Sequence, residues 1–168
     1  MFGVSTLRNA RRASLLAACF ASSTLSAGVY LNVRNSPSLS ITTTNLAAGA
    51  GSDLTSTQTV TTQQLLDINV YGFNSYTWEV DIAFSTTGMT WPSGATVTAK
   101  RTSNGGNSNI AGGTSAMQLT SSAQPLFTGK GDATGVSIQY VVSGLNLSNC
   151  SPGNNYSFPI RFTYGVFG

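Results

Sequence analysis

The alternation of apolar and polar residues with a period of two is the feature that most constrains the fold of this chain. It is clearest at residues 76–84, where Tyr, Trp, Val, Ile and Phe occupy every second position and Thr, Glu, Asp and Ala lie between them. An extended strand here has one apolar and one polar face. The same pattern recurs at 66–70, 136–142 and 156–164. No stretch after residue 27 shows helical spacing over three turns, so the pattern predicts an all-β protein.

Weaker alternation marks further candidate strands, with turn-forming residues between them. These candidates are 29–33, 39–41, 55–62, 95–100 and 117–120. About eight to nine short strands with such punctuation predict a single antiparallel β-sandwich domain over residues 28–168, with a barrel as the less favoured alternative. Within this domain we expect a hairpin turn at 129–132 and one long flexible loop at 103–115.

Residues 1–27 have the pattern of a secretory signal peptide. Three arginines within the first twelve residues precede an apolar run at 13–25, and the small residues Ser26 and Ala27 follow it. An amphipathic first helix is the alternative. Removal of these 27 residues leaves five basic and five acidic residues, so the formal charge of +3 falls to zero. The basic excess therefore does not indicate a nucleic-acid partner.

A second kind of processing is also encoded in this segment. Residues 16–19, Leu-Ala-Ala-Cys, resemble a bacterial lipobox, in which Cys19 becomes the lipidated first residue. The apolar stretch between Arg12 and Cys19 is short for such a leader, so plain secretion is the favoured interpretation. Contact with a membrane is expected only if Cys19 is lipidated.

The composition offers little for catalysis. The chain has no histidine, which excludes nucleophile systems of the Ser/His/Asp and Cys/His types. Glu79 and Asp81 lie two residues apart on one strand face, a spacing that in principle suits a glycosidase, but a solvated strand face is the favoured interpretation. We therefore expect no enzyme, and no catalytic, cofactor-binding or metal-binding residues.

The two tryptophans and one cysteine are the remaining candidates for a specific role. Trp78 belongs to the apolar face of residues 76–84 and is expected in the core. Trp91, next to Pro92 at a strand–loop junction, is a candidate ligand contact for a carbohydrate, although tryptophan more often fills the core of a sandwich. Cys150 has no partner once Cys19 is removed, which favours a buried thiol over an intermolecular link.

The end of the chain resembles that of a known family. Two alternating segments, 136–144 and 155–164, bracket a Pro-Gly turn at 152–153, and the given sequence ends four residues after the second segment. This arrangement resembles the C-terminal pattern of secreted bacterial fimbrial subunits and similar Ig-like surface proteins. In that family an alternating extension of one subunit completes the sheet of the next, with a periplasmic chaperone and an outer-membrane usher as partners. Pro159 predicts that the last strand borders an open edge.

The resemblance implies a candidate strand for contacts between subunits. Val29, Leu31 and Val33 would fill pockets of a neighbouring molecule, with the alternative that they form the first strand of their own sandwich. The sequence thus predicts a secreted, non-enzymatic structural subunit of a bacterial surface fibre, fimbria or matrix, which self-associates through β-strands. The alternative is a monomeric extracellular binding module, with carbohydrate bound through exposed aromatics such as Trp91.

Overall fold

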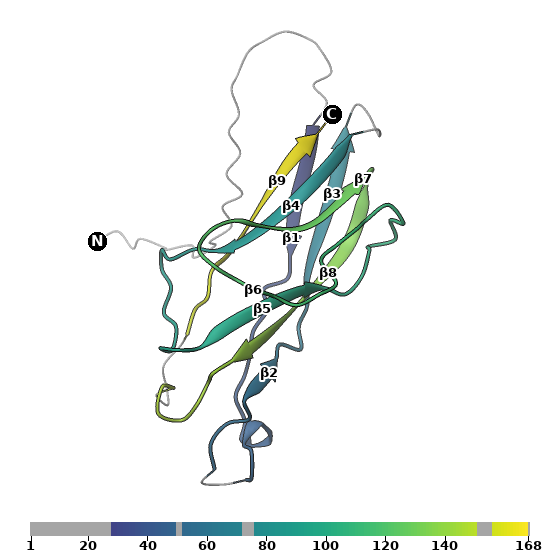
Figure 1. Ribbon diagram of the computed structural model, residues 1–168. Helices are drawn as coiled ribbons and strands as arrows, with labels where there is room; N and C mark the ends of the chain where they lie inside the picture. Colours follow the sequence, from purple (N-terminus) through teal and green to yellow (C-terminus); the bar gives the residue numbers. More distant parts are fainter. Residues whose placement is uncertain (1–27, 50–51, 72–75, 151–155, 168) are drawn as a thin grey trace, which may run out of the picture.

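The computed structural model describes residues 28–49, 52–71, 76–150 and 156–167 (Figure 1). The expected signal peptide at 1–27 and the Pro-Gly turn at 152–153 lie outside these residues. Over the described ranges the chain forms nine β-strands and one short 3-10 helix, η1 (Thr43–Asn45), with no α-helix. None of the helical structure in these ranges has the length and apolar character needed to cross a membrane.

The strands form two antiparallel sheets packed face to face, which confirms the predicted β-sandwich. The larger sheet contains, in order, β1 (Gly28–Arg34), β3 (Gln64–Tyr71), β8 (Ala133–Ser143), β5 (Thr96–Arg101) and β6 (Met117–Gln118), while β2 (Thr57–Thr59) pairs with β8. The smaller sheet contains, in order, β7 (Gln124–Lys130), β4 (Thr77–Phe84) and β9 (Ile160–Phe167). β1 and β9 are therefore edge strands.

The core lies between the sheets and is built from the alternating residues that the sequence indicated. Trp78, Val80 and Ile82 of β4 are buried, as is the apolar face of β3 and β8 opposite them. Trp78, as expected, is completely buried. One face of β3, β4 and β8 is thereby removed from water, which is the main stabilising contribution to such a sandwich.

The contacts between the sheets show which strands of the small sheet lie over which strands of the large sheet. The guanidinium carbon of Arg101 in β5 lies 6.0 Å from the ring centroid of Phe127 in β7. The β7 flank of the small sheet therefore covers β5. Because the order is β7, β4, β9, the β9 flank lies on the side of the large sheet that ends in β3 and β1.

β7 is a strand that the sequence pattern did not predict. Its pairing with β4 shifts register, so that Val80 lies opposite Phe127 and Asp81 opposite Pro125. Leu126 is the extra residue of this irregularity, and both Leu126 and Phe127 are buried. Such a bulge breaks the alternation of buried and exposed residues, and Pro125 further hides the strand signal.

The expected hairpin at 129–132 is wrong, because this turn joins strands of different sheets. It links β7 in the small sheet to β8 in the large sheet. Trp78 Nε1 donates to the Gly131 carbonyl oxygen at 2.9 Å, and the Val70 N–H donates to Asp132 Oδ1 at 2.6 Å. These two hydrogen bonds attach the turn to both sheets and make it a corner of the sandwich.

Four other expectations can be compared with the structure. Residues 39–41 form no strand, and the last strand begins at Ile160 rather than at residue 156. Pro159 precedes β9, which is nevertheless an edge strand as predicted. The loop after β5 is attached to the sandwich: Arg101 is buried, its Nε and Nη2 donate to the Gly112 carbonyl oxygen at 2.9 and 2.7 Å, and Ala111 pairs with Thr128.

Candidate functional site

The predicted intersubunit strand forms β1 at the edge of the large sheet. It pairs antiparallel with β3 of the same chain, from Gly28 opposite Tyr71 to Arg34 opposite Leu65. Val29 is buried, and Leu31 and Val33 are half-buried and pack against the core. Within one chain these residues therefore form the first strand of their own sandwich, and their transfer to a second molecule stays a prediction.

The backbone of β1 also has a free side. The Val70 N–H donates to Asp132, and therefore points away from β1. Val29, opposite Val70, then occupies a pair without mutual hydrogen bonds. It follows that Val29, Leu31 and Val33 turn their N–H and C=O groups toward the side of β1 where the described residues place no strand.

The edge of the small sheet has the same property. The Ser85 N–H donates to the Pro159 carbonyl oxygen at 2.8 Å, which fixes the alternation of hydrogen-bonded pairs between β4 and β9. Phe162, Tyr164 and Val166 consequently direct their backbone polar groups away from β4. No strand among the described residues pairs with that side of β9.

The side chains of β9 add apolar surface to this edge. Tyr164 lies opposite Val80 and Val166 opposite Trp78, so both side chains point toward the space between the sheets. Val80 and Trp78 are buried, yet Tyr164 is 38% exposed and Val166 45% exposed. Two inward-facing apolar side chains thus remain accessible at the flank of the sandwich.

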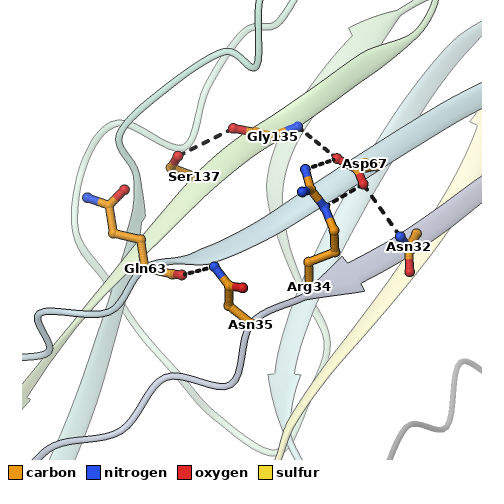
Figure 2. A network of polar contacts seen from close by, with 7 residues as sticks. All are labelled: Asn32, Arg34, Asn35, Gln63, Asp67, Gly135 and Ser137. Atoms are coloured by element: carbon orange, nitrogen blue, oxygen red, sulfur yellow. Dashed lines mark hydrogen bonds and ion pairs between the residues drawn. The ribbon is translucent and has the colours of Figure 1, made fainter.

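A polar network fastens the end of β1 to the sheet (Figure 2). Arg34 makes an ion pair with Asp67 of β3, with Nε 2.7 Å from Oδ2 and Nη2 2.7 Å from Oδ1. The Gly135 N–H of β8 donates to Asp67 Oδ1 at 2.8 Å, and Asn32 Nδ2 donates to Oδ2 at 3.4 Å. Asp67 occupies the irregularity in the β3–β8 pairing between Leu66 and Ile68. Its carboxylate thus links three strands.

The environment of Asp67 favours its charged form. Burial alone would raise the pKa of Asp67, but the hydrogen bonds from Arg34 and from the Gly135 N–H, with the positive charge of Arg34, lower the pKa below its ordinary value of 3.8. The side chain of Asp67 is 15% exposed, so this interaction is less screened than one on an open surface.

We expect the stabilising effect of Asp67 to disappear in acid. Because the pKa is lower in the folded state, the carboxylate stabilises the fold above pH 3.8 and loses this effect as the pH falls through the folded-state pKa. Asp67→Asn should lower the free energy of unfolding at pH 7 by about 1–2 kcal/mol, and the difference from wild type should shrink below pH 3.8. Urea unfolding followed by circular dichroism at several pH values measures this, with Glu79→Gln as control. A difference that stays constant with pH would contradict the assignment.

The residue after β1 has a backbone conformation that is unusual for a side chain. Asn35 has φ 63° and is the one non-glycine residue with positive φ among the described residues. Its Nδ2 donates to the Gln63 carbonyl oxygen at 3.3 Å, and its own carbonyl oxygen accepts from Gln64 Nε2 at 3.4 Å. Tyr140, whose pKa is raised by burial, donates from its hydroxyl to Gln64 Oε1 at 2.5 Å. Asn35 is therefore held by a chain of bonds that reaches the core.

Trp91 lies in a different part of the molecule, in an apolar groove of about 600 Å³. The groove is lined by residues that include Val60, Val97, Tyr140, Val142, Trp91 and Phe158. Trp91 is half-buried, its ring centroid is 4.9 Å from that of Phe158, and its Nε1 donates to the Ala95 carbonyl oxygen at 3.0 Å. The indole N–H is thus already engaged within the protein.

The remaining candidates show no grouped chemistry. Glu79 and Asp81 lie half-buried on the face of β4 opposite to Trp78 and Val80. Cys150 is a free, half-buried thiol at the groove, packed against the core. The described residues contain no cluster of three or more His, Cys, Asp or Glu that could hold a metal ion.

Four residues at the two edges could not be identified from the sequence. Arg34, Asp67, Tyr164 and Val166 acquire their roles from strand register, which alternation alone does not give. The one signal for the ion pair was the opposite charge of Arg34 and Asp67, because charged residues make up only 8% of the chain. In comparisons with known proteins, no family model, curated protein or solved structure matches this chain.

Proposed function

We propose that the protein is a secreted, non-enzymatic structural subunit of a bacterial surface fibre, fimbria-like or matrix-forming, that assembles through β-strand contacts between subunits. The observation that carries this proposal is the edge strand β9, where the inward-facing side chains of Tyr164 and Val166 remain exposed next to backbone groups that no described strand pairs with. An added strand beside β9 would satisfy those groups and cover both side chains.

Within the described residues, the edge strands β1 and β9 lack most of the protection that soluble monomers use. Natural edge strands are commonly shielded by charged side chains, proline or bulges. β9 contains one charged residue, Arg161, and β1 contains one, Arg34, which is occupied by Asp67. On the outer face beside β1, Tyr30 and Tyr71 are both exposed, with ring centroids 5.2 Å apart. Exposed aromatic surface therefore lies on the outer face beside the β1 edge.

Two different open edges suit growth in one direction. A contact between the β1 side of one molecule and the β9 side of another is heterologous, and such contacts generate open chains when rotation does not close a ring. Repetition of this contact would extend a fibre without further binding surfaces. A periplasmic chaperone that covers the edges before assembly, and an usher that receives the subunits, are the partners that this mode of assembly calls for.

A charge at the β9 edge is expected to block assembly without unfolding the subunit. Tyr164→Lys places an ammonium group among the exposed apolar side chains, where an incoming strand would have to bury it at a cost of several kcal/mol. We expect wild type to elute as high-mass species in size-exclusion chromatography and Tyr164→Lys to elute as a monomer. Both should keep the same β-sheet circular dichroism spectrum.

Thr163→Lys is the matched control, because it adds the same charge to the neighbouring residue, which faces the opposite side of β9. It should assemble as wild type does. A wild-type chain that elutes as a monomer at every concentration would overturn the fibre proposal. Equal loss of assembly in both variants would show that a positive charge on either face of β9 blocks assembly. That result would contradict the role assigned to the inward-facing side chains.

The alternative function, a monomeric binding module, takes its support from the apolar groove at Trp91. Pockets for small ligands are commonly apolar and of about 300–1,000 Å³, a range that includes this groove. Titration of the monomer with soluble oligosaccharides, followed by tryptophan fluorescence with Trp91→Phe as control, tests it. A fluorescence change that is lost in Trp91→Phe would favour the module.

A further inference from the structure

We propose that the apolar groove at Trp91 binds a single unbranched aliphatic chain, such as the acyl chain of a lipid, whose polar end stays in water at the mouth of the groove. The inference goes beyond the proposed function, because it concerns a small molecule bound by one subunit, whether or not subunits assemble. It assigns the groove a ligand of a different class from the carbohydrate of the alternative function.

The groove lies over the inner face of the large sheet, beside the end of the small sheet. Its floor includes Val97 of β5 and Tyr140 and Val142 of β8, whose side chains are buried. The small sheet reaches the groove with Ile160, the first residue of β9, and the chain just before β5 and just before β9 forms the wall on that side. The resulting cavity of about 600 Å³ is of the size that small ligands occupy.

Along the described residues, the floor presents paired strands rather than a free edge. β8 is paired on both sides here, since Val142 lies opposite Val97 of β5 and opposite Gln58 of β2. Next to the wall residues, the backbones of Thr90 and Ser157 exchange two hydrogen bonds, at 3.0 and 2.7 Å. A peptide strand bound on this floor would leave its own N–H and C=O groups without partners. The energetic cost of such unpaired groups disfavours a peptide as the occupant.

The polar aromatic side chains at the groove are already engaged within the protein. Trp91 Nε1 donates to a backbone carbonyl oxygen at 3.0 Å, and the Tyr140 hydroxyl donates to Gln64 Oε1 at 2.5 Å. The Tyr156 hydroxyl donates to the Asn149 carbonyl oxygen at 3.5 Å. In the described part of the chain, no charged residue lines the groove. A carbohydrate would lose hydrogen bonds to water here without replacement, whereas an aliphatic chain has none to lose.

Exposed aliphatic side chains mark the mouth of the groove. Ile41 and Leu147 both line it and are 44% and 53% exposed. The apolar lining thus includes both the buried floor and side chains in contact with water, as the lengthwise entry of an aliphatic chain requires. Cavities lined by apolar side chains take up apolar molecules in preference to water.

A homologous series of straight-chain alcohols tests the inference. We expect hexanol, octanol and decanol to bind the full chain with dissociation constants that fall by about threefold to fourfold per methylene, the factor for removing one CH₂ group from water. Isothermal titration calorimetry measures these constants, and the heat-capacity change of binding should be negative. In a Cys19→Ser chain, Cys150, which lines the groove, is the only cysteine, and decanol should slow its reaction with N-ethylmaleimide.

A charge at the mouth provides the matched comparison. Ile41→Asp should weaken decanol binding by about tenfold, whereas Ser40→Asp, one residue away and outside the lining, should bind decanol as wild type does. Both residues are exposed, so both variants should fold, which circular dichroism checks. Leu147→Asp, also at an exposed position of the mouth, replaces Ile41→Asp if that variant is unfolded.

Three results would overturn the inference: no binding of any alcohol, equal affinity for hexanol and decanol, or equal effects of Ile41→Asp and Ser40→Asp. Binding of a soluble oligosaccharide that is lost in Trp91→Phe would assign the groove to carbohydrate instead. Each of these results leaves the fibre proposal standing, because size-exclusion chromatography of the same samples reports assembly separately.

Discussion

Trp78→Ala is expected to lower the free energy of unfolding by about 3–5 kcal/mol, the range for truncating a buried aromatic residue. The side chain is completely buried, and its ring lies edge-on to Phe127 with centroids 6.0 Å apart. Its Nε1 also donates to the Gly131 carbonyl oxygen in the corner that joins the two sheets. The substitution therefore opens a cavity in the core and removes a bond that ties the corner to β4.

Urea unfolding followed by far-ultraviolet circular dichroism measures this effect without relying on the removed fluorophore. Glu79→Ala, one residue further along β4 on the opposite face, is the control and should change the free energy of unfolding by less than about 0.5 kcal/mol. If Glu79→Ala were the more destabilising change, the faces of β4 would have to be assigned the other way round.

Gly129→Ala is expected to destabilise the protein by about 3 kcal/mol, at the upper end of the usual range for overpacking. Gly129 lies directly opposite Trp78 on β7, and a methyl group there would sit 2.5 Å from Cζ2 of the indole ring. Real carbon atoms do not approach so closely, and the buried ring has little room to retreat. The absence of a side chain at Gly129 thus leaves the space that the Trp78 ring occupies.

Gly165→Ala is the matched control, because Gly165 lies on the other neighbour of β4 and its nearest contact would be Phe167 at an ordinary 3.4 Å. It should be close to neutral, as measured by thermal unfolding. In a Trp78→Ala background, Gly129→Ala should cost far less than in wild type, because the ring that it strikes is gone. Additive effects of the two substitutions would contradict this explanation.

An element could be predicted from the sequence only where its own residues show the alternation of apolar and polar side chains. β4 was predictable because Trp78, Val80 and Ile82 alternate with polar residues along one uninterrupted strand. β7 was not, since the bulge at Leu126 places two buried residues side by side. A bulge is a property of two strands in register, and a single strand's sequence does not display it.

The same limit applies to the sheets and to the candidate site. The turn at 129–132 has the residues of a hairpin, and only the bonds from Val70 and Trp78 show that it crosses between sheets. The apolar alternation of β1 was visible in the sequence, whereas the ion pair between Arg34 and Asp67 requires knowledge that these strands are neighbours. Charge pairs between distant segments are fixed by topology, so alternation could indicate the strand but not its partner.

The pairing of β4 with β9 has a consequence for the order in which this chain acquires its structure. The paired residues are far apart along the chain, from Phe84 with Ile160, 76 residues apart, to Thr77 with Phe167, 90 residues apart. Contacts of such high sequence separation form slowly, because a long loop must close before any bond repays the lost entropy. During synthesis, β4 therefore cannot complete its pairing with β9 until the last residue of β9, Phe167, has left the ribosome. The small sheet is therefore completed only after every strand of the large sheet has been synthesised.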